Sequence, residues 1–205
     1  MNPLIDTIRR ELEERTKISR LEYQDKQYLR EVMLYLKRNH SDRELCFGVR
    51  NDLLLGKNRH VTNPNLMVPG RFYLGEYDPI NKNMLWDRYP LLLVLERPTN
   101  GEILGLNFHF VSKLRKIEVF WRIQELLAKG MENSVGRINY LACKTLFEDH
   151  DVMTRRYKIR RFRKNTINIP YEYIKLLIMM NIQDFSVKSL TDDTAYKILF
   201  TRNRK

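Results

Sequence analysis

The most restrictive feature of the sequence is a pair of apolar runs separated by a turn signal. Residues 89–96 are rich in Leu and Val and too short for a helix, which predicts a buried strand. Thr99-Asn100-Gly101 follows, and an Asn-Gly pair is a strong short-range signal for a β-hairpin. Residues 102–111 are predicted as the returning strand, in which Gly105 suggests a bulge or a sharp bend. The centre of the chain is therefore predicted to be antiparallel sheet.

A further strand is predicted just before this hairpin, at residues 71–77, where apolar and polar side chains partly alternate. Asp78-Pro79 then begins a turn. Three or more short antiparallel strands around one apolar face predict a small barrel-like sheet. His109 is expected either to point outward from its strand or to be a hydrogen-bonded histidine of the core.

The run Trp86-Asp87-Arg88-Tyr89-Pro90 has two interpretations. In the structural one, which we favour, Asp87 caps a turn, Arg88 packs on an aromatic ring and Pro90 sets the start of the strand. In the other, these residues form a recognition loop.

Helical spacing of apolar residues predicts the remaining elements. Residues 4–39 are predicted as one helix, or as two with a break near 16–20. A helix is predicted to begin at Ser112 and to end at Gly130. The other predicted elements are helices at 134–149 and 171–180 and strand-like pieces at 185–187 and 196–201.

These elements predict an α+β protein: N-terminal helices, a small antiparallel barrel-like sheet, and C-terminal helices with a basic strand. The expected organisation is an N-terminal helical region (1–45), an irregular connector (46–70) and an α+β core domain (71–205). Gly and Pro punctuate the connector, and its apolar piece at 53–55 is expected to insert into the core. A connector of this length is usually functional or docks on a partner.

The charge of the chain is high and unevenly distributed. The sequence has 37 Lys plus Arg against 25 Asp plus Glu, a net charge of +12. Residues 151–205 hold 13 basic and five acidic residues, and so account for +8 of that total. Concentrated positive charge favours a polyanionic partner such as nucleic acid.

The basic segment 155–164 has seven cations in ten residues and is predicted to be extended. Alternate residues of a strand share a face, so the cations would line both sides, and the two aromatic rings could stack on bases. Two other interpretations stay open: an edge strand kept soluble by its charges, or a patch that docks on an acidic protein. The predicted DNA-binding residues are Arg155, Arg156, Tyr157, Lys158, Arg160, Arg161, Phe162, Arg163 and Lys164.

The sequence contains few of the motifs that support catalysis. It has no P-loop, GxGxxG, HExxH or CxxC motif, and no Asp/Glu-x-Lys triplet of the kind found in restriction-type nucleases. The only dense acid/His cluster, Glu148-Asp149-His150-Asp151, is expected to be a solvated helix end rather than a cation site. We therefore expect no enzyme activity, no catalytic residues, no metal and no cofactor.

Other partners and compartments are also constrained. Purely apolar runs such as Leu91 to Leu95 are far shorter than the roughly 20 residues of a membrane span, and no signal peptide is visible, so no membrane partner is expected. Cys46 and Cys143 lie in apolar contexts, which suits reduced, buried thiols in a cytosolic setting.

Three stretches resemble a family of tailed-phage proteins. They are residues 69–79 (PGRFYLGEYDP), residues 86–95 (WDRYPLLLVL) and residues 105–110 (GLNFHF), and Ile169-Pro170 followed by a helix also fits. The family consists of virion proteins of T-even-like contractile-tailed phages that are commonly labelled DNA end protectors. The resemblance covers roughly residues 69–180.

This resemblance implies a late, structural phage protein, found in the virion and in the host cytoplasm during assembly. Its expected partners are double-stranded DNA, at the ends or along the backbone of the packaged genome, and other structural proteins of the phage. The alternative that it leaves open is a structural component of the neck, tail or baseplate whose basic segment docks on protein neighbours.

Overall fold

A computed structural model describes the central sheet, the segments packed on it and the C-terminal helix. The described residues are 10, 48–51, 53–54, 63–80, 84–112, 115–116, 118–120, 122–123, 153–163, 166–169, 173–174, 177–178, 180, 182–187 and 190–203. Several predictions lie outside these residues: the N-terminal helices apart from Arg10, both cysteines, the helix at 134–149, the cluster at 148–151, and Lys164.

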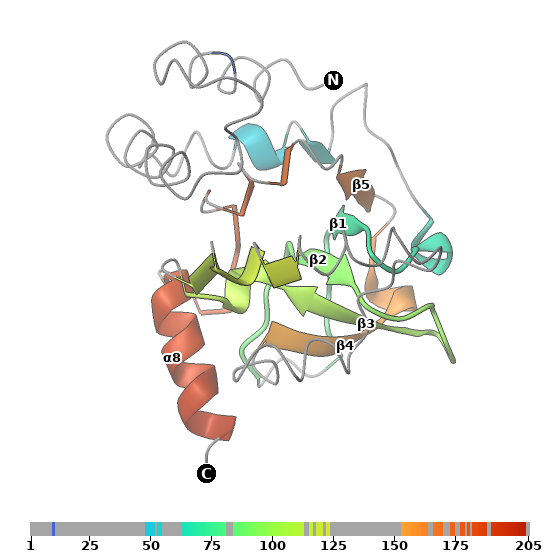
Figure 1. Cartoon of the computed structure of the whole chain (residues 1–205). Helices are drawn as coiled ribbons and strands as arrows, with labels where there is room; N and C mark the ends of the chain where they lie inside the picture. The colour runs from blue at the N-terminus through green and yellow to red at the C-terminus, as the bar shows by residue number, and fades with distance from the viewer. Residues whose placement is uncertain are drawn as a thin grey trace.

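The described strands form one antiparallel sheet of five strands in the order β4-β3-β2-β1-β5. The strands are β1 (Phe72–Leu74), β2 (Leu91–Val94), β3 (Glu102–Asn107), β4 (Thr154–Lys158) and β5 (Ile167–Ile169). Figure 1 shows the strands following one another across the molecule, with the C-terminal helix beside one end of the sheet. The prediction of a mixed α/β chain with a small antiparallel sheet is confirmed.

The predicted hairpin joins β2 to β3. Thr99 and Glu102 exchange two backbone hydrogen bonds of 2.9 Å, and the two residues between them turn the chain. Asn100 has φ 52° and Gly101 has φ 74°, so both occupy the left-handed region that a two-residue hairpin turn requires. Asn and Gly adopt this region most readily, which is why this pair of residues predicts the turn.

Two details of β3 differ from expectation. Gly105 pairs in regular register with Val94 and Arg155, so it forms no bulge; a Cβ there would lie 3.4 Å from the Leu92 side chain. The strand ends at Asn107 rather than continuing to residue 111. The Asn107 side-chain oxygen accepts the backbone N–H of His109 at 3.0 Å, and this cap turns residues Phe108–Phe110 into the 3-10 helix η3.

The chain after β4 crosses from one edge of the sheet to the other. The 3-10 helix η4 (Ile159–Arg161) follows β4, and Phe162 then forms a bridge with Tyr77. The Asp78 N–H donates to the Arg161 carbonyl at 3.1 Å, and the Arg163 N–H donates to the Glu76 carbonyl at 2.9 Å. The segment then becomes β5, which pairs with β1. A single ribbon thus connects the two edge strands.

Both faces of the sheet are buried. On one face, side chains such as Leu74, Leu93 and Leu106 join a large core with the helical residues between 115 and 123 and between 173 and 177. On the other face, Tyr73 and Leu92 pack into a second, smaller core. A strand buried on both sides needs apolar residues at every position, which explains the unbroken Leu-Leu-Leu-Val of β2.

The segment predicted as an irregular connector is partly helical. Residues 48–51 and 53–54 are helical, and residues Pro64–Leu66 form the 3-10 helix η2. Leu53 and Leu54 are buried in the large core, as expected for the apolar piece of this segment.

The strand predicted at residues 196–201 is wrong: Asp192–Asn203 is the helix α8. Thr191 begins it, because its side-chain oxygen accepts the Thr194 N–H at 3.3 Å and its carbonyl accepts the Ala195 N–H at 2.9 Å. Ala195 and Leu199, four residues apart, lie on one face and pack on Phe110 and Phe185. The residues of this run favour a strand by their composition, but the N-cap at Thr191 and the packing of one helical face make the segment a helix.

Candidate nucleic-acid interface

The predicted alternation of the basic segment holds through β4. Tyr157 pairs with Ile103 and is buried, whereas Arg156 and Lys158 on either side of it are exposed. The 3-10 helix η4 follows at once, and the alternation of exposed and buried residues continues through it to Arg160. The 3-10 helix buries Ile159 and leaves Arg160 exposed and Arg161 half-buried.

Four exposed cations thus share the outer edge of the sheet and the turn that follows it. We call them the basic surface: Arg156, Lys158, Arg160 and Arg163. Within the described residues, the side chains of Arg156 and Arg160 have no carboxylate or other hydrogen-bonding partner. Their charges therefore face solvent uncompensated, which is the state that a phosphate-binding surface requires.

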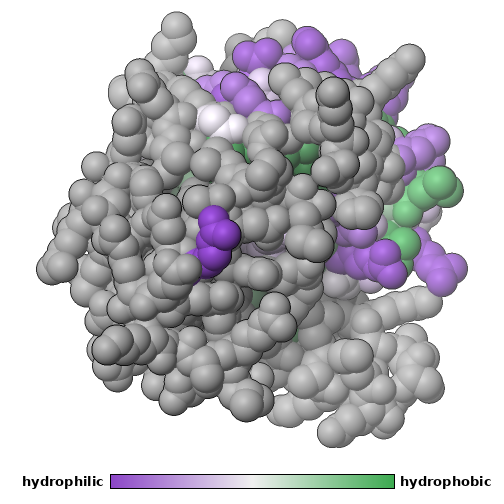
Figure 2. Space-filling view, turned by 90° about the horizontal axis from the view of Figure 1, so that it is seen from above, coloured by the Kyte–Doolittle hydropathy of each residue, from purple (hydrophilic) through white to green (hydrophobic). Residues whose placement is uncertain are grey.

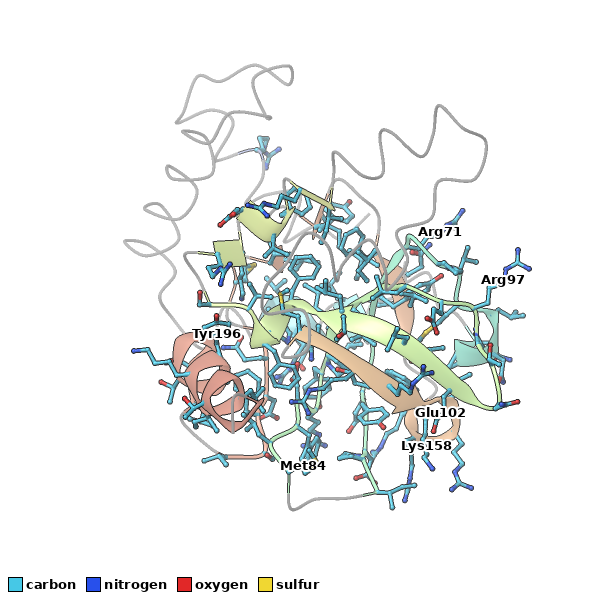
Figure 3. All side chains as sticks on the ribbon, turned by 60° about the horizontal axis from the view of Figure 1, so that its bottom comes forward. Arg71, Met84, Arg97, Glu102, Lys158 and Tyr196 are labelled. Carbon is cyan, nitrogen blue, oxygen red and sulfur yellow. The ribbon has the colours of Figure 1, made fainter. Side chains whose placement is uncertain are left out.

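The other two cations of the basic surface each have a carboxylate nearby. Lys158 Nζ lies 4.0 Å from Glu102 Oε1, and Figure 3 shows the two side chains at the same corner of the molecule. Arg163 Nη1 lies 3.5 Å from Glu76 Oε1, which also accepts Arg88 Nη2 at 2.9 Å. These pairs are exposed on the cationic side, so they restrain the side chains without removing much of the positive field.

Tyr157 and Phe162, predicted to stack on bases, lie in the core. They are 5% and 8% exposed, and their rings pack with Tyr77 at centroid distances of 5.0 and 4.9 Å. The prediction that these rings stack on bases is therefore wrong. Both rings pack against Tyr77 beneath the segment that crosses from β4 to β5.

Arg155 also differs from expectation, since its side chain lies on the inner side of β4. Its guanidinium carbon is 4.5 Å from the centroid of the Phe110 ring, and Nη1 donates to the Leu85 carbonyl at 3.4 Å. Burial lowers the pKa of Arg155. Arg155 therefore packs against Phe110 and Leu85 and is not part of the basic surface.

Behind β4 lies a buried polar network that was not predicted from the sequence. Asp87 Oδ2 is 2.6 Å from His109 Nδ1, and both side chains are essentially inaccessible to solvent. The same oxygen accepts Asn107 Nδ2 at 3.2 Å, and Asn107 Nδ2 also lies 3.3 Å from the Tyr157 hydroxyl. The network joins the 84–89 loop to β3 and β4, so it fixes the position of the basic strand.

The electrostatics of this network follow from burial and compensation. Burial alone would raise the pKa of Asp87, but His109 and the N–H groups of Asp184 and Tyr89 outweigh it, so the pKa lies below its usual value. Burial raises the pKa of Tyr157, which keeps the hydroxyl protonated. Asp87 and the Tyr157 hydroxyl both accept hydrogen bonds from the Asn107 side-chain amide.

The structural interpretation of the Trp86–Pro90 run is confirmed in its main points. Asp87 Oδ1 accepts the Tyr89 N–H at 3.1 Å, which makes it the cap of a turn. Arg88 lies over the Tyr89 ring at 5.4 Å from its centroid. Of the two positions expected for His109, the one in the core is confirmed and the one pointing outward from the strand is wrong, because the side chain is fully buried. The sequence signal for this pair is weak: His109 stands between two phenylalanines, and a polar group buried among apolar residues is normally hydrogen-bonded.

Comparisons with known proteins add no relative. No family model matches the chain, and neither the curated proteins nor the solved structures contain a match to it. The resemblance described above therefore stays a prediction from its quoted motifs.

Two further observations concern the described part of the chain alone. None of its helices has the length and hydropathy of a membrane span. In the same residues, no group of three or more His, Cys, Asp or Glu side chains is arranged to hold a metal.

Proposed function

We propose that this chain is a non-enzymatic DNA-binding protein of a tailed-phage virion, which contacts the ends or the backbone of packaged double-stranded DNA at the head-tail region. The observation that carries the proposal is the exposure of Arg156 and Arg160 without an acidic partner among the described residues. The resemblance of residues 69–180 to phage DNA end protectors supports the same function.

The basic surface suits a phosphate backbone better than a base edge. Its cations lie on an edge strand and a short turn, and the aromatic rings that would read or stack on bases are buried. Contacts of Lys and Arg with phosphates position a protein on DNA and carry no sequence information. We infer that binding is independent of sequence and that its affinity comes from the release of counterions.

A matched pair of variants tests this proposal. Arg156→Gln with Arg160→Gln removes two charges from the basic surface. Arg71→Gln with Arg97→Gln removes two exposed charges elsewhere, at the positions labelled in Figure 3. Binding of each protein to a short labelled duplex is measured at one fixed salt concentration. We expect the first variant to bind at least about tenfold more weakly than the second. Equal affinities of the two variants would contradict the proposal.

End binding and backbone binding are separated by the shape of the DNA. A blunt duplex and a covalently closed hairpin duplex of equal length offer the same backbone but differ in open ends. Tighter binding to the blunt duplex, lost in the Arg156/Arg160 variant, would assign the basic surface to DNA ends. Equal binding of both duplexes would assign it to the backbone.

A specific observation favours a second candidate, a structural component of the neck, tail or baseplate. Leu66 and Val68 are 68% and 47% exposed, and the η2 segment that carries Leu66 neighbours η4. Figure 2 shows hydrophobic atoms emerging among hydrophilic ones at one side of the described surface. Apolar side chains beside a basic turn suit an acidic protein neighbour.

The two candidates make opposite predictions for these apolar residues. Leu66→Ser with Val68→Ser leaves every cation in place, so DNA affinity should not change if the basic surface binds phosphates. Loss of incorporation into particles, with DNA affinity intact, would favour the structural component.

A further inference from the structure

A pocket of about 260 Å³ opens between β4 and residues 77–80 and 84–87. Its lining combines apolar and aromatic side chains of the loop, including Ile80, Met84 and Trp86, with residues Arg155, Arg156 and Lys158 of β4. Ile80 and Met84 are about half exposed, so the pocket has an apolar rim. In Figure 3, Met84 projects from the loop on the side of the molecule that carries the β4 residues.

Arg155 is held in the wall of this pocket. The Leu85 carbonyl and the Phe110 ring, which contact its guanidinium, both belong to the lining. The Nε atom is buried and makes no hydrogen bond with the part of the chain that the structure describes. A guanidinium has five N–H donors in a planar fork, so most of this hydrogen-bonding capacity is unused.

No carboxylate within the described residues compensates Arg155. Asp87, also in the lining, already accepts hydrogen bonds from His109, Asn107, Tyr89 and Asp184. Glu102 lies at the Lys158 end of the pocket. Burial lowers the pKa of Arg155, and the neighbouring Tyr157 offsets this lowering only in part. A half-buried cation that has no carboxylate among the described residues attracts an anion, because part of its hydration is lost without a compensating charge.

We propose that this pocket binds the phosphate group of a nucleotide, with Arg155 as its principal ligand and the flat, apolar part of the nucleotide against Ile80, Met84 and Trp86. The planar guanidinium fork matches phosphate oxygens in a bidentate manner. Arg156 and Lys158 add positive charge at the pocket mouth. The pocket shares Arg156 and Lys158 with the basic surface, but its principal ligand, Arg155, lies outside that surface, so variants of Arg155 and of Arg160 separate the two proposals.

The test uses the full chain and three probes: inorganic phosphate, adenosine monophosphate and adenosine. Binding is followed by the NMR signal of the Arg155 Nε–H group and by titration calorimetry at matched ionic strength. We expect saturable binding of adenosine monophosphate that shifts the Arg155 signal. Adenosine should bind at least about tenfold more weakly. Equal binding of adenosine and its monophosphate, or no shift of the Arg155 signal, would overturn the proposal.

Variants separate this site from the basic surface. Arg155→Met keeps the packing of the side-chain stem on Phe110 but removes the charge, and should weaken adenosine monophosphate by at least about tenfold. The control Arg97→Met removes an exposed cation outside both the pocket and the basic surface and should leave that affinity unchanged. An Arg155→Met protein that binds the nucleotide as the parent does would refute the assignment.

A second variant covers the case in which Arg155→Met fails to fold. Met84→Glu places a negative charge on the half-exposed rim and leaves the core intact, so it should weaken phosphate and nucleotide together. If duplex DNA competes with adenosine monophosphate, the phosphate that the pocket binds is that of a DNA strand. Simultaneous binding of both would assign the pocket to a free nucleotide. A short acidic peptide that occupies the pocket while phosphate does not would refute the proposal.

Discussion

Asp87 and His109, 22 positions apart in the sequence, are joined by a contact of 2.6 Å between Oδ2 and Nδ1 in a place that solvent does not reach. Asp87 comes from the loop before β2, and His109 comes from the turn after β3. The contact therefore ties the 84–89 loop to the strand against which β4 packs. The position of the basic surface depends on this buried pair.

Asp87→Asn should destabilise the fold by about 3–5 kcal/mol, because the buried carboxylate makes hydrogen bonds with His109, Asn107, Tyr89 and Asp184 that an amide cannot all replace. The amide keeps the size of the side chain but cannot accept hydrogen bonds at both of its heavy atoms. Urea unfolding of the variant and of the parent measures the difference. Glu118→Gln is the control, since its ion pair with Arg122 is about half exposed and should contribute less than about 1 kcal/mol. Equal effects of the two substitutions would contradict the structural role of Asp87.

The lowered pKa of Asp87 predicts how stability depends on pH. The unfolded chain binds this proton near the ordinary pKa of about 4, and the folded chain binds it at lower pH. The contribution of Asp87 is thus complete above about pH 4 and is lost as the pH falls through the folded pKa. Urea midpoints should fall more steeply in the parent than in Asp87→Asn over that acidic range. Parallel curves would show that Asp87 does not supply this dependence.

The basic surface predicts the salt dependence of DNA binding. If its four cations each neutralise one phosphate, log affinity should fall with log salt concentration with a slope of about −3.6. Arg156→Gln or Arg160→Gln should each reduce the magnitude of the slope by about 0.9. A titration from low to moderate salt gives the slope directly. A slope that neither substitution changes would place the phosphate contacts elsewhere.

Tyr157→Phe should leave DNA binding unchanged, because the ring is buried and offers no face to a base. The substitution removes the hydroxyl near Asn107 and should cost about 1 kcal/mol of stability. Tyr157→Ala empties the ring site between Tyr77 and Phe162 and should cost about 3–5 kcal/mol, as for other large aromatic residues. Unfolding and binding measured on the same preparations separate the two effects. If a stably folded Tyr157→Phe protein bound DNA more weakly, Tyr157 would contact DNA, contrary to this prediction.

Thr191→Ala should lower stability by about 1 kcal/mol, since the cap of α8 is lost. Thr191→Ser, which keeps the hydroxyl, should behave as the parent does. Thermal unfolding followed by circular dichroism compares the three proteins. An Ala variant as stable as the Ser variant would mean that the contacts of Ala195 and Leu199 alone hold the helix.

The sequence by itself determined the local features of the centre of the chain. The Asn-Gly turn, the fully apolar β2 and the cap at Asp87 depend on residues within a few positions of one another. In each case one residue type has a strong conformational preference, so the pattern is sufficient. The two-residue alternation of β4 could be predicted for the same reason, and it placed Arg156 and Lys158 on one face of the strand, although it did not show which face is exposed.

Only the tertiary structure decided which faces of the basic segment are open. Arg155 and Tyr157 lie inside because β4 pairs with β3 in one register, and Phe162 lies inside because the crossover ribbon bridges to Tyr77. The helix α8 and the buried Asp87–His109 pair likewise depend on partners distant in sequence. Such contacts are fixed by packing between elements, which local preferences do not encode. The charges of the candidate interface could be predicted from the sequence, but its shape and its pocket required the fold.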